Sequence, residues 1–166
     1  MSSRDGPRHW LGIYLNDHLA GATAGMELAW RFARSRQGTP DRKRLVSLAA
    51  DITADRQALM QLMRSAGVPV RGHKIVAGWI TEKVTRLKPN ANVLTRSPLS
   101  DLIELETLYL GIQGKGAGWR VLLGAAADDG LVDTERLRAL LDRADDQLAV
   151  VEELRIQAGT RLFSHD

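Results

Sequence analysis

One carboxylate stands where a helix would otherwise bury an aliphatic side chain. Between residues 45 and 62, leucine and isoleucine recur at three- and four-residue steps, and Asp55 occupies one of these steps. A buried carboxylate without a partner is strongly destabilising or takes up a proton. We therefore expect Asp55 to meet a cation, a metal ion or several hydrogen-bond donors.

Further carboxylates fall near the same level if the predicted helices pair as antiparallel hairpins. Glu27 then lies close to Asp51, and Glu106 reaches a similar level if a third helix begins beside the second. Gln147 offers an amide at this level on the last helix. The interior would thus hold several acidic and amide side chains, whose charge must be compensated.

Two basic side chains are candidate partners for these groups. Lys115 follows Leu108 and Ile112 on an apolar stripe and should come within reach of Asp55. His18 lies on the apolar stripe of the first helix, where a single histidine is more often a hydrogen-bonded core residue than a ligand. Because an interior lysine repels a metal cation, we favour a metal-free polar network. Its predicted members are His18, Glu27, Asp51, Asp55, Glu106 and Lys115.

Four long stretches with apolar residues at helical spacing must position these side chains. They predict α-helices over residues 7–36, 40–66, 98–126 and 133–158. No segment shows the alternating pattern of a β-strand. The chain is therefore expected to form a single all-α domain over residues 1–166.

The ends of these helices carry capping signals. Thr39 precedes a proline and is the predicted N-cap of the second helix, and Asp133 or Thr134 is the predicted N-cap of the fourth. Glycines are frequent in the third helix, without the Ser or Thr that follows the lysine of a phosphate loop. We expect them to allow close backbone approach, with Gly21 and Gly25 of the first helix opposite.

The lengths of the connections predict the topology. Short connections make antiparallel hairpins of the first and second helices and of the third and fourth. Residues 67–98 form a longer crossover, in which 73–87 should be a short helix carrying Trp79. This order of elements, together with the phrases 14–21 and 97–106, resembles the ferritin-like superfamily, in particular a group of ferritin-like proteins of actinobacteria.

The resemblance implies a four-helix bundle over nearly the whole chain, and no activity. It also implies an alternative site, in which Glu27, Asp51, Asp55 and Glu106 bind iron or manganese for oxidase or metal-buffering chemistry. The metal sites of that family use a Glu-x-x-His step. This chain lacks the step, because Ala54 stands three residues after Asp51 and Tyr109 three residues after Glu106.

Composition narrows the function classes. The chain has no cysteine, which excludes disulfides and thiolate-bound metals, and no motif of a known enzyme class is present. No run of apolar residues is long enough for a membrane span and no secretory signal is visible, so we expect a cytoplasmic protein. Basic residues gather in 64–96, yet the aromatic residues follow helical core spacing, which argues against nucleic-acid binding.

These observations favour a non-catalytic helical bundle without a cofactor that acts by self-association, as a homodimer, or by binding a protein partner. The crossover helix with Trp79 is one candidate contact, because an amphipathic helix outside the core buries its apolar side elsewhere. A second alternative, after the metalloprotein, is a binder of acidic partners. Its candidate residues are Arg71, Lys74, Lys83, Arg86 and Lys88.

Overall fold

The protein is all-helical over the residues that its computed structural model describes, which are 6–71, 97–129 and 133–164. The helices are α1 (Pro7–Ser35), α2 (Arg42–Ser65), α4 (Pro98–Asp129) and α5 (Thr134–Phe163). The four long helices predicted from the sequence are confirmed, and the last two run further than expected. No strand occurs in the described ranges. The short helix predicted over 73–87 lies outside them.

Local chemistry explains where the helices begin. The Asp133 side chain accepts a hydrogen bond from the backbone N–H of Arg136 at 3.1 Å, which confirms this residue as the N-cap of α5. The prediction for α2 was wrong, because α2 begins at Arg42 with Asp41 at its N-cap. The Thr39 hydroxyl instead donates to the Arg36 carbonyl at 2.8 Å and closes the turn that follows α1.

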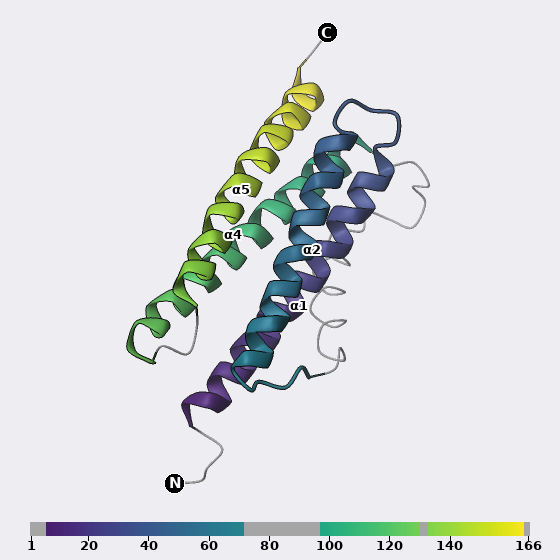
Figure 1. Ribbon diagram of the computed structural model, residues 1–166. Coiled ribbons are helices and arrows are strands. Elements are labelled where there is room, and N and C mark those ends of the chain that lie inside the picture. The colour runs from purple at the N-terminus through teal and green to yellow at the C-terminus, as the bar shows by residue number, and fades with distance from the viewer. Residues whose placement is uncertain (1–5, 72–96, 130–132, 165–166) are drawn as a thin grey trace.

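The helices pack as two hairpins, α1 with α2 and α4 with α5 (Figure 1). Between the hairpins, α1 lies beside α4 and α2 beside α5, and both of these neighbours are antiparallel. Their direction follows from ion pairs along their length, such as Arg31–Glu104 at 3.0 Å and Arg44–Glu153 at 2.5 Å. Because α2 and α4 are both antiparallel to α1, these two helices, on opposite corners of the bundle, run in the same direction. The last residue of α2 and the first residue of α4 therefore lie at opposite ends of the bundle.

The chain that leaves α2 turns over the first half of α1. Gly67 adopts a left-handed backbone conformation (φ 66°), which glycine tolerates at little cost. The Asn16 amide donates to the Pro69 carbonyl at 3.1 Å, and its oxygen accepts from the Arg71 backbone N–H at 2.7 Å. One side chain of α1 thereby holds the start of the connection to α4.

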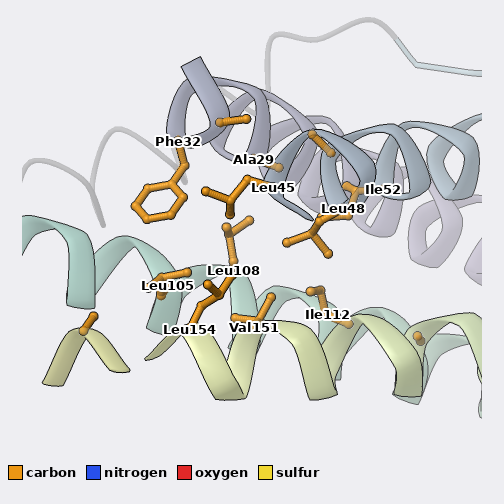
Figure 2. Close-up of a cluster of buried hydrophobic side chains, with 14 residues drawn as sticks. Ala29, Phe32, Leu45, Leu48, Ile52, Leu105, Leu108, Ile112, Val151 and Leu154 are labelled. Carbon is orange, nitrogen blue, oxygen red and sulfur yellow. The ribbon is translucent and has the colours of Figure 1, made fainter. Parts of the chain in front are cut away.

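The apolar core consists of two clusters, one toward each end of the bundle. Figure 2 shows the first, in which side chains of the α1–α2 hairpin point toward those of α4 and α5. The buried residues labelled there are Ala29, Phe32, Leu45, Leu48, Ile52, Leu105, Leu108, Ile112, Val151 and Leu154. The second includes Leu15, Leu19, Leu59, Met63, Trp119, Leu122, Leu137 and Leu140. Between the two clusters, at the middle of α2, α4 and α5, lies a level of polar side chains.

Among the described residues, no helix combines the length and the apolar character that crossing a membrane requires.

Candidate functional site

Asp55 is the centre of the polar level. Its side chain is 2% exposed, and three side chains of the other hairpin donate to it. Lys115 reaches one carboxylate oxygen at 2.5 Å, and the Gln147 amide donates to the same oxygen at 2.8 Å. Arg143 Nε donates to the second oxygen at 2.7 Å. Lys115 also donates to the Gln147 oxygen. We call these four residues the interior cluster.

The helix arrangement explains which residues meet. Because α2 and α4 lie on opposite corners, only a long side chain such as that of Lys115 can cross the interior to Asp55. Arg143 and Gln147 are four residues apart on α5, so they occupy one face of that helix, and this face meets α2. The contact between Lys115 and Asp55 is the one indicated by the apolar stripes in the sequence.

The charges of the interior cluster do not balance. One carboxylate faces two cations, of which Lys115 is nearly buried and Arg143 is 36% exposed. Burial lowers the pKa of the Lys115 ammonium below its ordinary value, and the nearby Arg143 lowers it further. The charges of Asp55 and Asp51 act in the opposite direction on this pKa. The lysine is therefore the member that is least able to lose its anionic partner.

Two predicted members of the network lie elsewhere. Glu27 and Glu106 are exposed, so their prediction as interior residues was wrong. Glu27 is two residues before the buried Ala29, which places it on the opposite side of α1. Glu106 follows the buried Leu105 and turns toward α5, where Arg155 lies at 3.5 Å. The register of a hairpin determines how far along the helix axis a residue lies. It does not determine how each helix is rotated about that axis.

The other two predicted members lie near the polar level without a contact to Asp55. Asp51 is half-buried one turn before Asp55 and acts on Lys115 through its charge. His18 is half-buried, and its ring meets Tyr14 edge to face with centroids 4.5 Å apart. The imidazole also lies against Gly118, where an added Cβ would be only 2.7 Å from its Cε1. Burial lowers the pKa of His18, and the charge of Asp17 opposes this effect.

His18 also explains one of the glycines. Gly118 is the glycine of α4 at which an α1 side chain comes close, because the imidazole occupies the space of its missing side chain. The expected approach of Gly21 and Gly25 to this helix was wrong, since no described residue lies within 4 Å of a Cβ built at either position.

The carboxylates proposed as metal ligands do not form one site. Glu27 and Glu106 are on the surface, and both oxygens of Asp55 accept hydrogen bonds from cationic or amide donors. In the described part of the chain, no group of three or more His, Asp or Glu residues could hold a metal ion. Of the residues proposed to bind acidic partners, Arg71 is exposed and the remaining four lie outside the described ranges.

Arg143 is the member of the interior cluster that the sequence analysis did not anticipate. Arg143 directly precedes the buried Ala144 and is itself partly exposed. The available signal was its spacing of four from Gln147, which places both side chains on one face of α5. A carboxylate opposite that face would attract the arginine.

A second feature is the outer face of α4, the side of this helix turned away from the core. It consists of Leu99, Ile103, Leu110, Gly114, Ala117 and Val121, which follow one another at helical spacing. Leu110 is 66% exposed and Val121 57% exposed. Since the opposite side of α4 is buried in the core, this helix is apolar on both sides.

Comparison of the chain with protein-family models, with curated proteins and with solved structures finds no match.

Proposed function

We propose that this protein is a non-catalytic helical bundle that acts by self-association, with the outer face of α4 as its interface. The observation that carries the proposal is the exposure of Leu110 and Val121 on a mostly uncharged stripe, in which Glu106 fills the step between Ile103 and Leu110. Burying a large aliphatic side chain contributes about 1.5–3 kcal/mol, so a partner on this face would gain substantially. Helices that are apolar on all sides are usually covered.

The interior cluster supports a structural role rather than a catalytic one. Asp55, the acidic group at its centre, is 2% exposed and already accepts three hydrogen bonds. Lys115, a possible nucleophile, points to the same carboxylate and to Gln147. A general acid or nucleophile must reach a substrate within hydrogen-bonding distance, and these groups are directed at one another.

We further propose that the bundle has the ferritin-like arrangement, in which the connection over residues 67–98 is the single long crossover between the two hairpins. The directions of the helices support this, because α2 and α4 run the same way. The anchoring of Pro69 and Arg71 by Asn16 supports a connection that starts over α1.

Sedimentation velocity of the wild type and of Leu110→Glu tests the proposed function. We expect the wild type to dimerise at micromolar concentration and Leu110→Glu to sediment as a monomer with unchanged helicity. Ala50→Glu is the matched control, because Ala50 is an exposed alanine on α2, away from the proposed interface. A wild type that is monomeric over the whole range, or a dimer that Leu110→Glu leaves intact, would refute the proposal.

A further inference from the structure

We infer that two copies of the chain pair through antiparallel α4 helices, with a twofold axis between Gln113 and Gly114. This inference rests on the proposed self-association and specifies its geometry. The outer face runs from Leu99 to Val121, about 33 Å at 1.5 Å per residue. A twofold interface must be complementary to itself, which is a strict requirement on the order of residues along one helix.

The sizes of the side chains meet this requirement. With the axis in that position, Leu110 of one copy lies opposite Ala117 of the second, and Ile103 opposite Gly124. Ala117 and Gly124 are exposed small residues, so Leu110 and Ile103 would each enter a space left by a small side chain, while Val121 comes opposite Glu106. Parallel pairing would instead place Leu110 against Leu110 and Gly114 against Gly114.

The charges beside the outer face are complementary in the same arrangement. Glu106 of one copy comes within reach of Arg120 of the second, and the twofold axis makes this contact twice. Both side chains are available, since they are 48% and 62% exposed. Within the chain each already has an ion-pair partner, Arg155 at 3.5 Å from Glu106 and Asp145 at 3.8 Å from Arg120. Parallel pairing would bring the two glutamates together and the two arginines together.

Gly114 is a further reason to place the axis here. It is exposed in the interior of α4, and nothing described lies within 4 Å of a Cβ built on it. Such a glycine destabilises a helix by about 0.5–1 kcal/mol relative to alanine. Packing inside the bundle does not require it, whereas close approach of a second α4 at the twofold axis would.

Disulfide formation tests the pairing, because the chain has no cysteine of its own. Leu110→Cys and Ala117→Cys proteins, mixed and oxidised, should form a disulfide-linked dimer of one chain of each kind. Each variant alone should not, since residue 110 lies about 10 Å along the axis from its symmetry mate, beyond disulfide reach. Leu110→Cys mixed with Ala50→Cys is the control.

A charge exchange tests the same geometry without oxidation. Glu106→Arg or Arg120→Glu alone should weaken dimerisation about tenfold, because each creates two like-charge contacts per dimer. The double variant Glu106→Arg/Arg120→Glu should restore wild-type affinity.

The outcomes separate this inference from the proposed function. A dimer in which each cysteine variant links to itself has parallel helices, which overturns the antiparallel pairing and leaves self-association standing. A dimer that gives no α4 disulfide and does not respond to the charge exchange uses another surface, which overturns both the pairing and the proposed interface. A monomeric wild type refutes both proposals.

Discussion

Replacing Asp55 by leucine should destabilise the protein more than any surface substitution. The change leaves Lys115 buried without its anionic partner, whereas Arg143 can turn into solvent from its partly exposed position. Breaking a buried ion pair on one side typically costs about 3–5 kcal/mol. For a domain of this size, that corresponds to a fall in melting temperature of about 6–20 °C.

The coupling between the two residues gives a sharper test than the single variant. Asp55→Leu/Lys115→Met removes both charges and should recover most of the lost stability, because an apolar pair of similar volume can replace a buried ion pair. The recovery should be incomplete, since Gln147 keeps a buried amide that donated to Asp55, worth about 1–3 kcal/mol. Urea denaturation of the wild type, both single variants and the double variant measures the coupling free energy.

Glu153→Leu is the matched control for this cycle. It removes one side of the exposed ion pair with Arg44 and should lower the free energy of unfolding far less than Asp55→Leu does. The reasoning is refuted if Asp55→Leu is as stable as Glu153→Leu, or if the double variant loses the sum of the two single losses.

Three further predictions concern the rest of the bundle. Gly118→Ala should lower the free energy of unfolding by about 1–3 kcal/mol in urea denaturation, because the new Cβ collides with His18. Gly111→Ala is the control and should be neutral or stabilising, because no described residue lies within 4 Å of its new Cβ. Acidification should reduce stability as the pH falls below 6.5, the ordinary pKa of histidine, because the lowered pKa of His18 makes the unfolded chain take up more protons than the folded one. In thermal melts, the melting temperature of His18→Asn should fall less on acidification than that of the wild type. An equal fall in the two proteins would contradict this prediction. Protein purified without chelators should carry less than about one equivalent of iron, manganese or zinc by elemental analysis, since an interior lysine opposes a cation beside Asp55; close to two equivalents would restore the metalloprotein alternative.

Much of the fold could be predicted because its signals are local. Apolar spacing and the capping residue Asp133 mark the helices, and the short connections fix which helices form hairpins. Asp55 and Lys115 could be matched because each interrupts an apolar stripe at a comparable level. A polar residue inside such a stripe is informative, since the helix period alone dictates that it faces inward.

The sides of Glu27 and Glu106 could not be predicted, because they depend on how each helix is rotated about its axis. The local sequence around these residues does not determine that rotation. Glu27 and Glu106 were placed at plausible levels but point away from the interior. α4 has apolar residues on both sides, so its periodicity alone does not show that Val121 lies on the exposed side.

The interior cluster gives the bundle a specificity that its apolar core lacks. Rows of leucine repeat with each helical turn, so apolar clusters alone would tolerate one hairpin sliding along the other. A slide of one turn moves Lys115 by about 5.4 Å relative to Asp55, which leaves a carboxylate and an ammonium buried and unpaired. The cluster therefore penalises every alignment but one, even though apolar replacements could match its contribution to stability. The same alignment fixes the rotation of α4, because Lys115 must point inward to reach Asp55, and this turns Leu110 and Val121 outward. The buried ion pair thus favours the rotation of α4 that turns Leu110 and Val121 outward.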